Sequence, residues 1–235
     1  MIQIDNLGAS YERIQALRGV MLNISTGTVF AVLGANGAGK TTLLRSILGL
    51  VTTTGTVHLD GEDISRLATH ERIRRGIAIV PEGRRLFSDL SVRENLLIGA
   101  INRADRSRVQ SDLNEICDAF PILAKRRDQP AKSLSGGEGQ LLALGRAMLS
   151  KPKVLLLDEP SVGLMPKAVT EVFTTIASVC REKGLTILIV EQNAKKALKI
   201  ADEAAVLELG SVALRDSAQG MRDDPRVQEA YLGGH

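Results

Sequence analysis

A chain of 235 residues is long enough to bury a sizeable core, as one large domain or two small ones. Its 30 basic and 27 acidic residues give a net charge of +3, which is too balanced to indicate nucleic acid as a partner. Aromatic residues make up only 3% of the chain. We therefore expect a core of Leu, Ile, Val and Ala, as in a buried parallel sheet flanked by helices.

We expect neither a signal peptide, nor a membrane span, nor a cysteine metal site. Residues 1–5 are not a basic segment leading into an apolar one, and no apolar run approaches the ~20 residues that a membrane span needs. Cys117 and Cys180 have no CxxC spacing, which favours two free thiols in a reducing compartment. Any membrane association is expected to run through a partner.

The first third of the chain has the pattern of strands separated by turns. Strands are expected at residues 2–7, 20–24, 29–33, 56–59 and 77–80. Residues 29–33 are continuously apolar, which is typical of a fully buried strand. A glycine-rich loop follows at once, and then a helical pattern that Gly49 ends.

The middle of the chain changes to helical patterns. Ser91 and Glu94 have the spacing of a capping box, which opens a helix expected to continue to Ile101. Further helices are expected at residues 105–120 and 136–149. After Pro152 the alternation of strands and helices returns. Strands are expected at 154–157, 185–190 and 204–209, the last of these being the final strand, and helices at 166–183, 194–201 and 225–232.

The glycine-rich loop, G-A-N-G-A-G-K-T, matches the phosphate-binding pattern G-x-x-x-x-G-K-[ST] between a strand and a helix. Its backbone N–H groups and the helix N-terminus would converge on the phosphates of ATP. Lys40 would reach the β- and γ-phosphates, Thr41 would ligate Mg²⁺ and Thr42 would add a hydrogen bond. The predicted binding residues are Gly34, Ala35, Asn36, Gly37, Ala38, Gly39, Lys40, Thr41 and Thr42.

Two carboxylates follow the apolar residues 154–157. Asp158 and Glu159 are expected at the edge of the sheet, beside the phosphate loop. Asp158 would hold Mg²⁺, through the metal's water, and Glu159 would act as general base on the attacking water. Two acids at a strand end are otherwise often only solvated, but the phosphate loop favours the catalytic interpretation.

The segment L-S-G-G-E at residues 134–138, called here the signature segment, opens the helix at 136–149. Its serine and glycines offer a second helix N-terminus suited to an anion. Alone, the segment would be a glycine turn with a capping serine. The order of phosphate loop, helical insertion, signature segment and Asp-Glu pair gives it a functional interpretation.

In this order of segments the chain resembles, along its whole length, the ATP-binding subunits of ABC transporters. The resemblance implies an α/β fold: a P-loop NTPase (RecA-like) core, an N-terminal antiparallel β portion and an inserted helical lobe. Residues 1–235 would form one ABC ATPase domain, with the ATP-binding core at 1–83 and 152–235 and the helical lobe at 84–151. Two subunits would sandwich two ATP molecules.

The resemblance also implies roles for residues outside the phosphate loop. Ser135, Gly136 and Gly137 would contact the γ-phosphate of the ATP that the partner subunit binds. Tyr11 would stack on the adenine of this chain's own ATP.

Three further segments are similar to the shorter ATPase subunit of bacterial branched-chain amino acid importers. They are V-P-E-G-R-R-L-F at 80–87, V-E-Q-N-A at 190–194 and the ending A-Y-L-G-G at 230–234. The similarity implies a heterodimer with a second ABC ATPase subunit in the full transporter, or a homodimer in isolation. It also implies two transmembrane permease subunits and, indirectly, a periplasmic solute-binding protein. The chain would be peripheral, at the cytoplasmic face of the inner membrane.

Three positions depart from the general family pattern. Most ABC ATPases have Gln where this chain has Glu82, at a position that senses the γ-phosphate and Mg²⁺. Most have His where this chain has Gln192, at the position that holds the γ-phosphate and the general base. Gln can donate a hydrogen bond but carries no proton or positive charge. Both changes recur in the branched-chain subgroup, and they leave the rate of hydrolysis open. Gly139 stands where a larger residue is usual.

Other functions stay open at this point. Related importers carry urea, short amides and other small solutes. A soluble ABC-type ATPase of DNA repair or of the ribosome is disfavoured, because the gap before the signature segment is short, has no cysteine pairs, and only one ATPase unit is present. A switch that binds ATP without hydrolysing it is disfavoured by Glu159 and favoured by Gln192.

Overall fold

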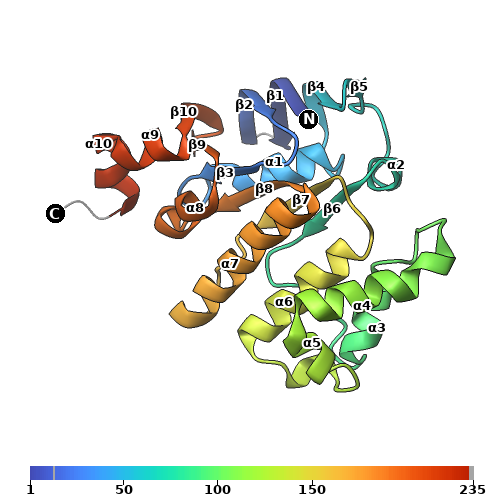
Figure 1. The fold of residues 1–235 in the computed structure, drawn as a ribbon. Helices are drawn as coiled ribbons and strands as arrows, with labels where there is room; N and C mark the ends of the chain where they lie inside the picture. Colours follow the sequence, from blue (N-terminus) through green and yellow to red (C-terminus); the bar gives the residue numbers. More distant parts are fainter. Residues whose placement is uncertain (13, 233–235) are drawn as a thin grey trace.

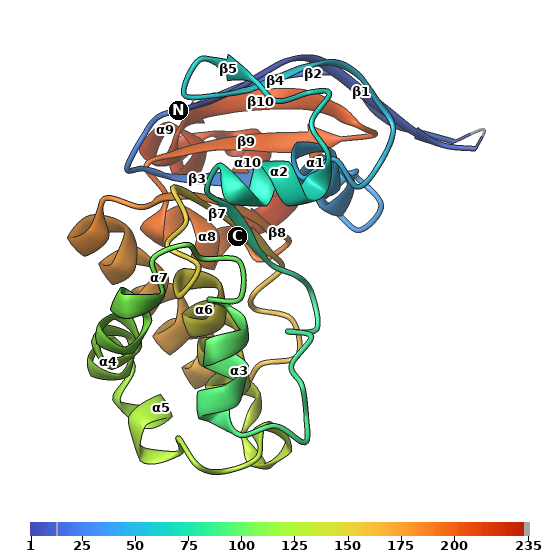
Figure 2. The ribbon, with the colours of Figure 1, turned by 90° about the vertical axis from the view of Figure 1, so that its right-hand side faces the viewer.

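The computed structural model describes residues 1–12 and 14–232. In Figure 1 the strands form the upper part of the molecule, and the helices of residues 92–148 form a separate group below them. Figure 2, turned by 90°, shows the same division into two parts. The ending of the chain at Gly233 and Gly234 lies outside the described residues.

The first sheet is antiparallel and begins at the N-terminus. Its strands, in pairing order, are β2 (Ile14–Ile24), β1 (Ile2–Tyr11), β4 (Thr53–Leu59) and β5 (Glu62–Asp63). Ile4 pairs with Leu22 on one side and Val57 on the other, and all three side chains are buried. They share a core with the helix α1 (Lys40–Ile47), so this sheet covers the helix that follows the phosphate loop.

The second sheet has the strand order β10-β9-β3-β8-β7-β6. Its strands are β3 (Val29–Leu33), β6 (Ile77–Val80), β7 (Val154–Asp158), β8 (Thr186–Glu191), β9 (Glu203–Glu208) and β10 (Ser211–Ser217). All neighbours pair in parallel except β9 and β10. The five parallel strands therefore end at one edge, where loops of α/β proteins form binding sites.

Both faces of the second sheet are covered. Alternate residues such as Phe30 and Val32 face α1 and the first sheet, whereas Ala31 and Leu33 face the opposite core. That opposite core contains α7 (Pro166–Lys183) and α8 (Ala194–Ile200). Burial on both faces explains why these strands are continuous apolar runs.

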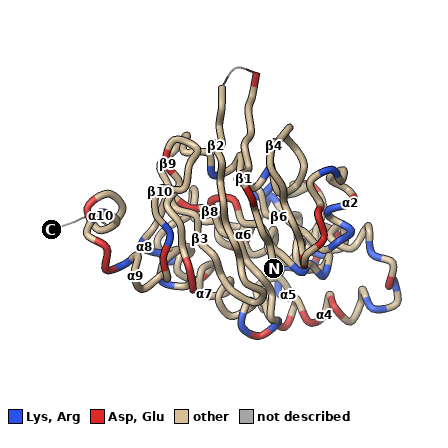
Figure 3. The backbone as a smooth tube through the Cα atoms, turned by 90° about the horizontal axis from the view of Figure 1, so that it is seen from above, with Lys and Arg blue, Asp and Glu red and all other residues tan. Residues whose placement is uncertain are grey.

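The remaining helices lie between the strands and after them. They are α2 (Thr69–Arg74), α3 (Val92–Ile98), η1 (Arg106–Arg108), α4 (Val109–Ala119), α5 (Pro121–Lys125), η2 (Ala131–Ser133), α6 (Gly136–Met148), α9 (Ala218–Asp223), α10 (Pro225–Val227) and η3 (Gln228–Leu232). In Figure 3 basic and acidic residues alternate around α2 and α4, and the central strands are largely free of charge. Among the described residues, no helix has both the length and the apolar composition needed to cross a membrane.

The strand expected at residues 204–209 is present as β9, but the expectation that it is the final strand was wrong, because β10 follows it. After β9 the chain turns back through Leu209 and Gly210, with φ of 46° and 83°, into β10. Two successive residues of positive φ are typical of a tight hairpin turn. The sequence S-V-A-L-R-D-S of β10 is half polar because the strand forms an edge of the sheet, so it lacks a strong strand pattern.

Two helix boundaries also differ from prediction. The helix that opens at Ser91 ends at Ile98 rather than Ile101, and residues 106–108 form η1 before α4 begins. Side-chain contacts hold the segment between them. The Arg103 guanidinium donates to the carbonyl of Leu149 and pairs with Asp105, so this stretch is fixed without being helical.

Candidate nucleotide site

Apart from Tyr11, the predicted site residues of the ATP-binding core lie at or just after the ends of four neighbouring parallel strands. β3 leads into the phosphate loop, β7 ends in Asp158, and Gln192 follows the end of β8. Glu82 lies two residues beyond β6, which pairs with β7. The strand order therefore brings these segments to one edge of the sheet.

The backbone of the phosphate loop approaches two other segments of the chain closely. At these two contacts only glycine fits, because a side chain would clash with a backbone carbonyl. A Cβ atom on Gly39, whose φ is 106°, would lie 2.7 Å from the carbonyl oxygen of Ala16. A Cβ atom on Gly34 would lie 2.5 Å from the backbone carbonyl oxygen of Leu207. The helix α1 begins at Lys40, and the N–H groups of its first turn have no partner within the helix. They are available to phosphate oxygens.

Lys40 is buried, with its side chain only 3% exposed. Its Nζ atom donates to the carbonyls of Gly34 (2.8 Å) and Ala35 (3.0 Å) and lies 3.0 Å from the carboxylate of Glu159. Glu159 has a φ of 45°. This left-handed conformation costs a residue other than glycine on the order of 1–3 kcal/mol, and such strain clusters at functional sites.

Thr41 and Asp158 meet at the end of β7. The Thr41 hydroxyl donates to the Asp158 carboxylate at 2.9 Å. Burial raises the pKa of Asp158, and the charges of Glu159 and Glu82 raise this pKa further, whereas the bond from Thr41 opposes them. A bound cation would relieve this repulsion between carboxylates.

The donor set at this point consists of a hydroxyl and carboxylate oxygens, which suits Mg²⁺. No cluster of three or more His, Cys, Asp or Glu side chains within residues 1–12 and 14–232 is arranged to hold a metal by protein groups alone. Mg²⁺ is commonly bound by one or two carboxylates together with substrate phosphates. The residues present therefore fit a metal that arrives with a nucleotide.

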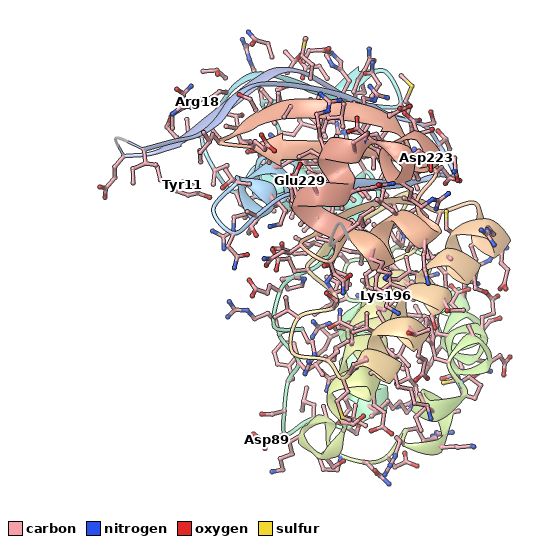
Figure 4. All side chains as sticks on the ribbon, turned by 90° about the vertical axis from the view of Figure 1, so that its left-hand side faces the viewer. Tyr11, Arg18, Asp89, Lys196, Asp223 and Glu229 are labelled. Carbon is pink, nitrogen blue, oxygen red and sulfur yellow. The ribbon has the colours of Figure 1, made fainter. Side chains whose placement is uncertain are left out.

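A cavity of about 640 Å³ lies over the phosphate loop. Its lining residues are Tyr11, Ala16, Asn36, Gly37, Gly39, Lys40, Thr41, Thr42, Glu82, Glu159, Val162 and Gln192. Tyr11 comes from the hairpin between β1 and β2, and Figure 4 shows it on this hairpin beside the loop that follows β3. With 39% of its surface exposed, the Tyr11 ring is accessible to a planar group.

Several of the predicted site residues do not line this cavity. Within the loop, Gly34 and Ala38 are buried. Asp158 is buried at the end of β7, and Ala35, although exposed, is not among the lining residues. The signature segment lies apart, at the start of α6, where the Ser135 hydroxyl accepts a bond from the Glu138 amide at 3.3 Å. The segment contributes no residue to the lining of this cavity.

Sequence reasoning missed two residues that hold this edge of the sheet. Glu191, at the end of β8, is 1% exposed and accepts hydrogen bonds from Ser161 and Asn193. Burial raises the pKa of its carboxyl, and those hydrogen bonds oppose the rise. Arg146, on α6, donates to the carbonyls of Arg84 and Arg85, which lie just after Glu82. The sequence did contain one signal for Glu191, because this residue is a charged side chain at the end of an apolar strand.

Comparison with known families gives a match over most of the site. A family model described as ABC transporter matches residues 17–162. The chain is 43% identical over 235 residues to the high-affinity branched-chain amino acid transport ATP-binding protein BraG of Pseudomonas aeruginosa, covering 100% of both chains. It is 38% identical over 234 residues to a probable branched-chain amino acid transport ATP-binding protein, LivF, of Archaeoglobus fulgidus, covering 99% of both.

Another similar protein and two similar structures extend the comparison. The lipopolysaccharide export system ATP-binding protein LptB of Escherichia coli is 34% identical over 231 residues, covering 97% of this chain and 95% of LptB. The ADP conformation of MJ1267, an ATP-binding cassette, superposes with a TM-score of 0.88 at 26% identity, covering 99% and 98% of the chains. A dimeric structure of the cassette MJ0796 gives a TM-score of 0.80 at 25% identity, covering 93% and 99%.

Proposed function

Because the chain belongs to the ABC transporter family of ATP-binding subunits, we propose that it hydrolyses ATP to power an importer of branched-chain amino acids. The family and the α/β P-loop fold expected from the sequence are both confirmed, and the family's activity makes the chain an ATPase. The full-length identity to BraG and LivF carries the assignment of the solute. LptB, at 34% identity, is less similar than either.

The geometry supports a specific arrangement for ATP. The triphosphate would lie along residues 34–41, with the Lys40 ammonium at the β- and γ-phosphates and the first amides of α1 on phosphate oxygens. The adenine would stack on the exposed ring of Tyr11. These contacts bind and orient the nucleotide, which is the main task of the protein in phosphoryl transfer.

Glu159 is the residue that we assign to the attacking water. It lines the cavity, and its carboxylate lies next to the ammonium that would hold the γ-phosphate. A water between the Glu159 carboxylate and the γ-phosphate would give a proton to Glu159 as its oxygen bonds to the γ-phosphorus, while the bond from that phosphorus to the bridging oxygen breaks and ADP leaves. Gln192, from the end of β8, lines the same cavity and would donate an amide hydrogen bond to the γ-phosphate.

Mg²⁺ would be held by Thr41 and Asp158, and the exposed Glu82 lines the same cavity. When bound, the ion would neutralise charge on the phosphate oxygens. Glu82 adds a carboxylate where most relatives have an amide, which strengthens the attraction for a cation. Gln192 cannot carry a positive charge, which weakens the hold on the γ-phosphate relative to a histidine.

The signature segment supports a two-subunit site. Ser135, Gly136 and Gly137 begin α6 and do not line this chain's own cavity. In the proposed transporter they cap the ATP of a second, related ATPase, and two permease subunits join the pair to the cytoplasmic face of the membrane. The heterodimer is favoured over a homodimer because a weakened site at Gln192 is better tolerated in an asymmetric pair.

Uptake into proteoliposomes tests which solute the transporter carries. The complete transporter would contain this chain, the second ATPase, the permease subunits and the solute-binding protein. We expect ATP-dependent uptake of labelled leucine, isoleucine and valine, and its loss with Lys40→Ala in this chain. Uptake of urea or a short amide, without branched-chain amino acids, would contradict the solute but not the ATPase activity.

Copurification tests the heterodimer. A tag on this chain, expressed together with the other subunits, is expected to recover a complex with one copy of each ATPase. Recovery of a complete, transporting complex with this chain as the only ATPase would exclude the heterodimer.

A further inference from the structure

Glu191 is a buried carboxylate that has no basic partner among residues 1–12 and 14–232. It is 1% exposed, and it takes part in none of the ion pairs within the described residues. Burying an unpaired charge is costly, so a carboxylate retained here needs a reason. Glu191 lies at the end of β8, the strand between β3 and β7, and therefore at the edge of the sheet that carries the nucleotide site.

All the hydrogen-bond partners of Glu191 are donors. Oε1 accepts the Ser161 amide at 2.9 Å, and Oε2 accepts the Ser161 hydroxyl and the Asn193 amide, both at 3.0 Å. An ionised carboxylate accepts through both oxygens, so it satisfies all three donors. A glutamine of the same shape would turn an NH₂ group toward at least one of them.

These bonds join the two segments that carry the hydrolytic residues. Ser161 lies two residues after Glu159, and Glu191 directly precedes Gln192. The Glu159 amide also donates to the carbonyl of Val190 at 3.0 Å. Glu159, in its strained left-handed conformation, is therefore held to the end of β8 by a backbone bond on one side and by Glu191 on the other.

We propose that Glu191 is a positioning residue, whose carboxylate locks the loop after Glu159 to the segment of Gln192 so that both face one γ-phosphate. The proposal rests on the function assigned above to Glu159. Val162, next to Ser161, lines the nucleotide cavity, so the locked loop is part of the wall of the site. Glu191 itself does not line the cavity and touches no reacting group.

Steady-state ATP hydrolysis by the full chain tests this role with Glu191→Gln, Ser161→Ala and the double variant. We expect Glu191→Gln to lower kcat by about tenfold or more, because misplacing a reacting group by ~1 Å costs up to ~100-fold. KM and the affinity for a fluorescent ATP analogue should change by less than about twofold, since the phosphate loop is untouched. The double variant should be no slower than Glu191→Gln alone, because both changes break the same link.

Asp112→Asn is the matched control, because Asp112 is also a buried carboxylate, 5% exposed, but lies in the helical lobe and pairs with Arg103 and Lys151. It should lower Tm and leave kcat unchanged. Three results would overturn the proposal: an unchanged kcat in Glu191→Gln, a fall in kcat no larger than the control shows at the same loss of Tm, or fully multiplicative effects in the double variant.

The remaining outcomes are also decisive. If Glu191→Gln does not fold, Ser161→Ala still tests the link, because it removes one hydroxyl and should lower kcat with KM unchanged. A wild-type kcat in Ser161→Ala would then overturn the proposal. If the role assigned to Glu159 is itself wrong, the result is different: kcat will be unchanged in Glu159→Gln.

Discussion

The ammonium of Lys40 lies 3.0 Å from the carboxylate of Glu159, and both side chains are shielded from solvent. The phosphate-binding cation and the proposed general base are therefore each other's partner. The β- and γ-phosphates of ATP would compete with Glu159 for the same ammonium. A change to either residue is expected to alter both nucleotide binding and hydrolysis.

Glu159→Gln should change ATP binding and ATP hydrolysis in opposite directions. The amide cannot accept a proton, so phosphate release is expected to fall by about 100-fold or more. ATP affinity should rise severalfold, because one negative charge near the phosphates is removed. Phosphate release and titration with a fluorescent ATP analogue measure the two effects. Glu171→Gln, an exposed change on α7, is the control. Unchanged turnover in Glu159→Gln would remove this residue from the mechanism.

Lys40→Ala should abolish tight nucleotide binding while the fold survives. The variant loses a charge-assisted contact to the phosphates and leaves the Glu159 carboxylate facing them unpaired. Calorimetric titration with ATP is expected to give an affinity at least about 100-fold weaker, a loss of ~2.7 kcal/mol. Circular dichroism should be unchanged. Lys153→Ala is the control, because Lys153 is 64% exposed and its one ion pair among the described residues is with Asp60. Nanomolar-to-micromolar affinity in Lys40→Ala would contradict the site assignment.

Much of the binding site could be read from the sequence because its parts are local. The phosphate loop works through its own backbone, so its glycines and Lys40 are recognisable in a single stretch. Asp158 and Glu159 follow an apolar strand whose burial on both faces is visible as an unbroken run. Their position after a strand placed them at the edge of the sheet, but the strand order that brings them beside the loop was not predicted and comes from the structure.

The parts that could not be predicted depend on contacts distant in sequence. Ser161 and Glu191 are thirty residues apart, and no local pattern pairs them. Arg146 holds the carbonyls of Arg84 and Arg85 across about sixty residues. β10 was missed for another reason: an edge strand is partly exposed, so its sequence lacks an apolar signature.

Stability in acid should depend on the ion pairs of Arg103. The guanidinium of Arg103 holds the pKa of Asp105 at about 2, below the usual 3.8. A carboxyl with a lowered folded pKa adds stability above its unfolded pKa, and this stability is lost as the pH falls toward the folded pKa. Wild type should thus lose part of its stability between about pH 4 and pH 2 through this pair.

Urea unfolding of Asp105→Asn at several pH values checks this expectation. The variant should be less stable than wild type at pH 6, and the difference should shrink toward zero as the pH approaches about 2. Asp118→Asn is the control: Asp118 is exposed on α4 and forms no ion pair with any residue in the part of the chain that the structure describes, so this variant should track wild type throughout. A constant difference at every pH would mean that Asp105 acts through packing and not through its charge.

Gly139, the unusual residue in α6, is expected to tolerate a side chain. A Cβ atom there would lie 3.5 Å from the Cδ atom of Arg84 and 3.5 Å from a methyl carbon of Leu86, which are ordinary contacts. Its φ is not in the left-handed region, so the backbone favours alanine as well. Gly139→Ala should therefore raise the free energy of unfolding by roughly 0.5–1 kcal/mol.

Gly99→Ala is the contrasting variant, because its Cβ atom would lie 1.9 Å from the carbonyl oxygen of Arg146 and must displace backbone. It should lower the free energy of unfolding in the same urea titration. A loss of stability in Gly139→Ala would mean that Arg84 and Leu86 cannot yield the space. If Gly139→Ala is more stable but hydrolyses ATP more slowly, the space beside Gly139 would be needed for Arg84 to move over the signature segment. Glycine at this position would then favour turnover at the expense of stability.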